Sequence, residues 1–127
     1  MRATRRKFLL SAALMTAAGK SLASGDPPLV RIARLTIHEQ DLDRYKALLK
    51  EVGETSVKEE PGVLSLYSAS EKDDPTNITV FEIYADENAY RAHIQTSHFQ
   101  KYKVATKDMV KSLELKEMVP IALASRK

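Results

Sequence analysis

Two histidines and one glutamate stand close together in the chain and could move protons. Glu82 lies near the end of an apolar run that is predicted to form a strand, and His93 and His98 follow it. A neutral histidine accepts a proton close to physiological pH, and a nearby carboxylate can fix its tautomer or act as the base itself. These three residues are therefore the candidate catalytic groups.

Each candidate also has a structural interpretation. His93 can hydrogen-bond a backbone carbonyl and order a helix end, and His98 can be an ordinary residue in a first helical turn. A carboxylate in mid-strand needs a partner, so Glu82 can pair with an arginine such as Arg34 or with a second copy of the chain. In one continuous helix, residues five apart point about 140° away from each other, so the histidines converge only if the helix breaks.

The segment around the two histidines contains signals for such a break. Asp86 is suited to cap a helix, and Glu87 follows in the favourable first turn. Ser97 and Gln100 form a capping-box pattern, which predicts that a second helix starts there. We therefore expect a break at Thr96–Ser97 that lets both histidines face one cavity.

Aromatic side chains are the candidate substrate contacts. In the predicted strands, alternation places Tyr67 and Tyr84 on the same face as Glu82. Tyrosines there could bind an aromatic ring or donate a hydrogen bond, and the alternative is that they are plain core. Phe99, on the apolar stripe of the second helix, is the third candidate.

The elements that must position these residues follow from the apolar periodicity. Alternating or β-branched runs predict strands, and the 3–4 spacing of apolar residues predicts helices. The expected order is strand 29–37, helix 41–57 ended by Glu59–Gly62, strand 63–71, strand 78–84, helices starting at residues 86 and 97, and strand 113–123. This α+β order, β-α-β-β-α-β, is typical of a ferredoxin-like antiparallel sheet with helices on one face.

One sheet face would then lack helices. On strict alternation it carries more apolar side chains than a domain of this size leaves in water. We therefore expect a homodimer that packs sheet to sheet about a two-fold axis. The apolar residues assigned to this face are Val63, Tyr67, Ile78, Val80 and Tyr84.

The N-terminal segment resembles an export signal. Arg5-Arg6 is followed by Phe and Leu as in the twin-arginine motif, and the apolar run 8–18 is too short for a permanent membrane span. We predict cleavage after Ala23, which gives a signal peptide at 1–23, a linker at 24–28 and one domain at 29–127. A Sec signal or a basic amphipathic helix is the alternative. The expected location is periplasmic or secreted, with no stable membrane anchor.

Composition excludes several classes of site and partner. The chain has no Cys, so it has no disulfide, thiolate nucleophile or Cys-based metal site. The net charge is +3, but residues 1–23 hold five basic side chains and no acid. Removing these five from the 20 Lys and Arg leaves 15 against 17 Asp and Glu, so the domain has no basic excess for nucleic acid.

A set of short motifs makes the chain similar to the antibiotic biosynthesis monooxygenase-like family, which includes quinol monooxygenase and autoinducer-2-degrading types. The motifs are Glu60–Leu64, Asp74-Pro75, Phe81–Tyr84, Asp86-Glu87, Ala89, His93 and Thr96–Phe99. The resemblance implies a dimeric α+β barrel with a pocket between sheet and helices in each subunit. It also implies oxidation of phenols or quinols by dioxygen without metal or flavin, with the protein supplying a base and a dry cavity.

The sequence predicts no cofactor. Glu82, His93 and His98 have a spacing that matches no metal-binding motif. A relative of this fold degrades haem with a helix histidine, an Asn and a Trp; His93 matches that histidine by position, but the chain has no Trp.

The resulting hypothesis is a cofactor-independent monooxygenase that oxidises a small quinol, phenol or enolisable compound. His93 or His98 would be the base, Glu82 would orient it, and Tyr67, Tyr84 and Phe99 would contact the substrate. Two alternatives stay open: an isomerase or lyase acting on an enolisable carbonyl, and a non-catalytic dimeric barrel that binds a small ligand.

Overall fold

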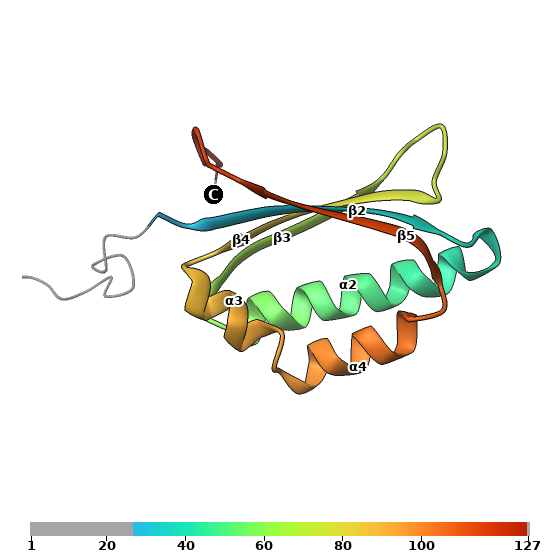
Figure 1. The fold of residues 1–127 in the computed structure, drawn as a ribbon, viewed down its shortest axis with the longest axis horizontal. Coiled ribbons are helices and arrows are strands. Elements are labelled where there is room, and N and C mark those ends of the chain that lie inside the picture. Colours follow the sequence, from blue (N-terminus) through green and yellow to red (C-terminus); the bar gives the residue numbers. More distant parts are fainter. Residues whose placement is uncertain (1–26, 127) are drawn as a thin grey trace, which may run out of the picture.

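A computed structural model describes residues 27–126. The predicted signal peptide and the first part of the predicted linker lie outside these residues. The described elements are β2 (Leu29–Ile37), a 3-10 turn (Glu39–Asp41), α2 (Leu42–Glu59), β3 (Val63–Ser70), β4 (Asn77–Tyr84), α3 (Glu87–His93), α4 (Ser97–Thr106) and β5 (Val110–Met118) (Figure 1). None of the described helices is long and apolar enough to cross a membrane.

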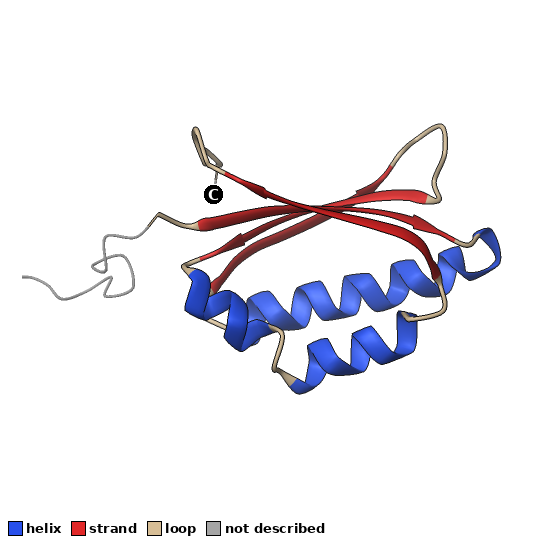
Figure 2. Cartoon of the chain, viewed as in Figure 1, coloured by secondary structure: helices blue, strands red, loops and turns tan. Residues whose placement is uncertain are grey.

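The four strands form one antiparallel sheet in the order β3-β4-β2-β5. All helices lie on one side of it, while the β3–β4 turn and the chain after β5 rise on the other side (Figures 1 and 2). The central strands β2 and β4 belong to the two halves of the chain, as in the ferredoxin-like plan. The predicted fold class is confirmed.

The core fills the layer between the sheet and the helices α2 and α4. Tyr45 of α2 is fully buried, and its hydroxyl hydrogen-bonds the hydroxyl of Tyr102 in α4 at 2.5 Å. The sheet supplies the other side of this layer, and burial of these apolar side chains is the main stabilising contribution. The buried cluster comprises Ala33, Leu35, Ile37, Tyr45, Ile78, Val80 and Met109.

The predicted bounds of the last strand and the predicted cap of α4 are wrong. The last strand begins at Val110 rather than at residue 113 and ends at Met118 rather than at residue 123, two residues before Pro120, which lacks the N–H that a ladder needs. The cap of α4 is Thr96 rather than Ser97: the Thr96 hydroxyl accepts a hydrogen bond from the Phe99 backbone N–H at 3.2 Å. Asp86 caps α3 as predicted, because its carboxylate accepts from the Ala89 N–H at 2.8 Å.

The predicted assignment of the open sheet face is also wrong for four of its five residues. Val63, Ile78, Val80 and Tyr84 are all buried, with 1–7% exposure, whereas Tyr67 is 62% exposed. A bulge between Val63 and Ser65 shifts the register of β3, so Val63 and Tyr67 do not share a face. Both faces of β4 carry apolar side chains, so alternation alone could not say which face the helices cover.

Candidate active site

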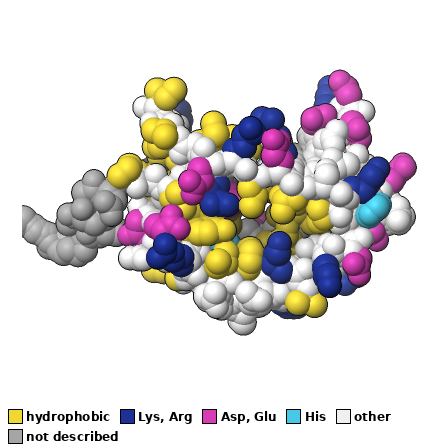
Figure 3. Space-filling model, viewed as in Figure 1, with side chains coloured by type: hydrophobic (Ala, Val, Ile, Leu, Met, Phe, Trp, Pro, Cys, Tyr) yellow, Lys and Arg dark blue, Asp and Glu magenta, His cyan; other side chains and the backbone are white. Residues whose placement is uncertain are grey.

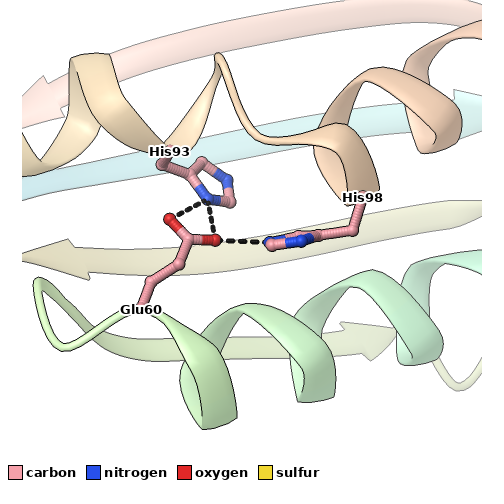
Figure 4. Close-up of side chains that lie close together, drawn as sticks. All are labelled: Glu60, His93 and His98. Carbon is pink, nitrogen blue, oxygen red and sulfur yellow. Dashed lines mark hydrogen bonds and ion pairs between the residues drawn. The ribbon is translucent and has the colours of Figure 1, made fainter.

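Glu60 joins the two histidines. One of its carboxylate oxygens, Oε2, lies 3.1 Å from Nδ1 of His93 and 2.6 Å from Nε2 of His98, and Oε1 lies 3.3 Å from the same His93 nitrogen (Figure 4). The side chains of Glu60, His93 and His98 are only 13%, 5% and 19% exposed. We call these three residues the triad.

The end of helix α2 fixes the carboxylate of the triad. Glu60 directly precedes Pro61 and is extended (φ −112°, ψ 105°), as the residue before a proline prefers. Its N–H donates to the Ser56 carbonyl and its own carbonyl accepts from Val63, both at 2.9 Å. A Cβ on Gly62 would lie 2.6 Å from Cβ of Ala89, so only glycine allows this turn to approach α3 so closely.

Thr96 positions both histidines. Its hydroxyl donates to the carbonyl of His93 at 2.8 Å, at the end of α3, and accepts from Phe99 in the first turn of α4. The two helices therefore meet at a fixed angle, and imidazoles five residues apart converge on one carboxylate. The predicted break at Thr96–Ser97 is confirmed. The prediction that both histidines face one cavity is wrong for His98: the rings converge on Glu60, and only His93 lines the cavity.

His93 also lines a cavity of about 160 Å³ between the sheet and the helices. Its ring lies 4.9 Å from the ring of Phe99 and 5.4 Å from that of Tyr84, measured between centroids, and both of these residues line the cavity as well. Most of the remaining wall is apolar, including Leu113 and Leu115 of the edge strand β5. Hydrophobic side chains gather between this edge and the helices on the surface (Figure 3).

A second carboxylate, Glu82, lies in the wall that the sheet forms. The Tyr84 hydroxyl donates to its Oε1 at 2.8 Å. Burial raises the pKa of Glu82, and the Tyr84 hydrogen bond and the charges of Arg31 and His93 offset only part of that rise. Burial and the nearby Glu82 also raise the pKa of Tyr84. Arg31 lies 4.5 Å from the ring centroid of Tyr90, in a cation–π arrangement at the cavity wall.

Of the six predicted site residues, four line the cavity, a fifth lies beside it, and the sixth lies on the other face of the sheet. His93, Tyr84, Phe99 and Glu82 line the cavity, and His98 reaches it through Glu60. Among the described residues, Glu82 makes no hydrogen bond to either histidine, so it is not the group that orients them. Tyr67, on the opposite sheet face, does not line the cavity.

Sequence reasoning missed Glu60 as a site residue. The available signal was its place in the helix-ending segment Glu59–Gly62, where an acidic side chain is held beside a rigid turn. That segment predicted where α2 ends, but not that this end packs against the end of α3 and the start of α4. Glu60 lies 33 and 38 residues from the two histidines in sequence, so only the tertiary fold brings them together.

The triad can hold a histidine in one tautomer. An ionised carboxylate only accepts hydrogen bonds, so Nδ1 of His93 and Nε2 of His98 are the protonated nitrogens when both rings are neutral. Nε2 of His93 then keeps its lone pair, and this ring lines the cavity. A base whose tautomer is fixed by a carboxylate is a recurrent arrangement in proton-transfer enzymes.

Comparison with known families supports the same interpretation of the fold. A family model described as antibiotic biosynthesis monooxygenase matches residues 28–105, from the start of β2 into α4. The chain belongs to this family. No match was found among curated proteins.

Several solved structures are similar to this chain. A protein from Bacteroides thetaiotaomicron, provisionally named an antibiotic biosynthesis monooxygenase, is 47% identical over 79% of this chain and 95% of its own, with a TM-score of 0.75. A provisionally named monooxygenase from Lactobacillus acidophilus is 29% identical over 72% of this chain and 44% of its own, with a TM-score of 0.71. A protein from Mycobacterium tuberculosis, at 22% identity and a TM-score of 0.69, covers 78% of this chain and 100% of its own and supports the fold alone.

Proposed function

We propose that the protein is a cofactor-independent monooxygenase that oxidises a small quinol, phenol or related enolisable compound. The observation that carries the proposal is the hydrogen bond between the Glu60 carboxylate and Nδ1 of His93. His93 also lines the cavity, together with the aromatic rings of Tyr84 and Phe99. The names of the related structures agree with a monooxygenase, and the substrate class rests on the chemistry of the cavity.

In this mechanism His93 acts as the base. A substrate hydroxyl gives its proton to Nε2 of His93, and the resulting anion is electron-rich enough to reduce dioxygen. Glu60 stabilises the imidazolium that forms, because the charged ring lies 3.1 Å from its carboxylate. For a quinol, one oxygen atom enters the ring and the other leaves as water. All four electrons come from the substrate, which becomes a hydroxyquinone.

The remaining cavity residues bind and orient the substrate. The rings of Tyr84 and Phe99, which both lie beside the ring of His93 and line the cavity, are suited to contact an aromatic substrate. A raised pKa favours the neutral form of Glu82, which can donate a hydrogen bond to a second substrate oxygen. The largely apolar wall excludes water, and exclusion protects the reactive anion from side reactions.

The proposal includes a homodimer that packs through the sheet face away from the helices. Tyr67, Phe81 and Ile32 are aligned in register across β3, β4 and β2 on that face. Tyr67 is 62% exposed in the single chain, and a large exposed aromatic side chain on a sheet face without helices is an expected dimer contact. A Tyr67→Lys variant that stays dimeric in sedimentation velocity would contradict this interface.

Export by the twin-arginine route is part of the same proposal and has its own test. The motif at Arg5-Arg6 supports it. Replacing both arginines with lysine should leave the precursor in the cytoplasm, measured by fractionation and immunoblotting. Normal export of that variant would exclude this route.

The deciding experiment is oxygen uptake by metal-free protein with a panel of substituted hydroquinones. We expect consumption of oxygen with at least one substrate, and its loss in His93→Gln. His38→Gln, which changes the histidine at the far end of β2, is the matched control and should keep full activity. Turnover without oxygen would instead identify an isomerase or lyase, and tight binding without turnover in either atmosphere would identify a binding protein.

A further inference from the structure

We propose that Glu60, His93 and His98 form a binding site for one divalent transition-metal ion of the zinc class. The ion would be a regulator rather than a cofactor, because it would occupy the nitrogen of His93 that Glu60 must hold for proton transfer. The binding site itself does not depend on the proposed function, whereas its inhibitory effect does.

The geometry of the triad is close to that of a coordination site. One ligand atom from each residue can be chosen so that all three lie within 4.8 Å of one another. Two ligands at about 2.1 Å from a common ion are separated by roughly 3.0–3.4 Å. The distance of 3.1 Å between Glu60 Oε2 and His93 Nδ1 already lies in this range. Nε2 of His98 lies 2.6 Å from the same oxygen, so it would have to move away by a few tenths of an ångström.

The donor set selects the kind of ion. Two imidazole nitrogens and one carboxylate oxygen suit Zn²⁺, Co²⁺ and Ni²⁺, whereas Mg²⁺ and Ca²⁺ prefer oxygen ligands throughout. Across residues 27–126, this is the one cluster of three or more potential ligands that lies close enough together. The three ligands come from the end of α2, the end of α3 and the start of α4 (Figure 4).

The local structure holds these ligands in place before any ion arrives. The turn at Gly62 fixes Glu60 against α3, and Thr96 fixes the two histidines relative to each other. Three protein ligands leave a further position for water, as in open zinc sites. His98, with 19% of its side chain exposed, offers a route from solvent to the site.

Metal binding would reverse the tautomer of His93. An ion on Nδ1 needs the lone pair of that nitrogen, so the proton of the neutral ring must lie on Nε2. Nε2 is the atom that we assign as the base, and a protonated nitrogen cannot accept the substrate proton. Zinc and substrate turnover should therefore exclude each other.

Binding is tested by titrating metal-free wild-type protein with Co²⁺, recorded by visible absorption, and with Zn²⁺, recorded by calorimetry. We expect one ion per chain. Glu60→Gln and His98→Gln should each weaken binding at least about 100-fold, since each removes one of three ligands. His38→Gln, which leaves the triad intact, should bind like wild type. An unchanged Co²⁺ spectrum at large metal excess, or undiminished binding by His98→Gln, would overturn the site.

Inhibition is tested with the hydroquinone identified by the oxygen electrode. Zn²⁺ should abolish oxygen uptake over the same concentration range in which it binds, and EDTA should restore it. Full turnover with zinc bound would refute the proposal that zinc inhibits the enzyme. Activation by zinc would refute that proposal and also the proposal that the enzyme needs no cofactor. A protein with no turnover on any substrate would refute the proposed function, while the Co²⁺ titration would still decide the site.

Discussion

Two carboxylates lie close to the cavity, and their surroundings differ. Glu60, at the end of a helix, accepts hydrogen bonds from two imidazoles, which suits an ionised group. Glu82, in the middle of a strand, receives one bond from the Tyr84 hydroxyl, and burial raises its pKa. Pairs of titratable groups in contrasting environments often divide the roles of acid and base between them. In the proposed mechanism, Glu60 is the partner of the base His93, and Glu82 contacts the substrate instead.

The largest expected effect is that of Glu60→Gln. The amide loses the negative charge of the carboxylate, so it stabilises an imidazolium poorly, and its NH₂ group donates where Oε1 or Oε2 now accepts. We expect kcat/KM for oxygen uptake to fall by roughly 10²–10⁴-fold, while Glu82→Gln, which keeps a hydrogen-bond donor in place, loses less than about ten-fold.

The control for this comparison is the neighbouring residue. Glu59 is exposed at the last position of α2, and Glu59→Gln should retain full activity. Thermal melts separate a lost catalytic contact from a lost fold. If Glu82→Gln were the more damaging of the two variants, the roles assigned to the two carboxylates would be reversed.

The turn that positions Glu60 gives the next prediction. In Gly62→Ala, the new Cβ would meet Cβ of Ala89 at 2.6 Å, so the turn or α3 must shift. We expect a loss of about 1–3 kcal/mol in the free energy of unfolding, measured with urea, together with a lower kcat. Gly53→Ala is the matched control, because its Cβ would make only an ordinary contact at 4.0 Å with Leu66. Equal stability of both variants would show that the turn is not tightly constrained.

The fold and the site differ in how much of each could be predicted from the sequence. Periodicity and turn residues predicted the order of strands and helices and the helix break, because those depend on local chemistry. The bulge in β3 left no local signal, so Tyr67 was predicted to share a face with Glu82 and Tyr84, whereas it lies on the opposite face. Glu60 is separated from both histidines by more than 30 residues, so its contact with them depends on how α2 packs against α3 and α4.

The second imidazole of the triad should have a smaller effect. His98 does not line the cavity and contacts Glu60, so in the proposed mechanism it is a positioning residue that acts through Glu60. We expect His98→Gln to reduce kcat by about ten-fold with little change in KM, and to shift the pH profile of kcat, since one donor to Glu60 changes. A steady-state pH series measures both. An unchanged pH profile with lower stability would give His98 a structural role only.

The smallest effect concerns Glu82 and the pH dependence of stability. A carboxyl whose folded pKa is raised binds its proton more tightly in the native state than in the unfolded state. Below the ordinary glutamate pKa of about 4.3 both states are protonated, so Glu82 has no pH-dependent effect there. As pH rises from that value towards the higher folded pKa, the unfolded state loses its proton first, and the wild type loses stability.

Glu82→Gln should abolish that loss, because an amide does not titrate. Its stability relative to wild type should therefore increase as pH rises above about 4.3, and level off once pH exceeds the folded pKa of Glu82. Urea unfolding at a series of pH values measures this difference. Glu114→Gln, which removes an exposed carboxylate of β5, should show no such rise. A flat or falling difference for Glu82→Gln would mean that Arg31 and Tyr84 offset the effect of burial on this carboxylate.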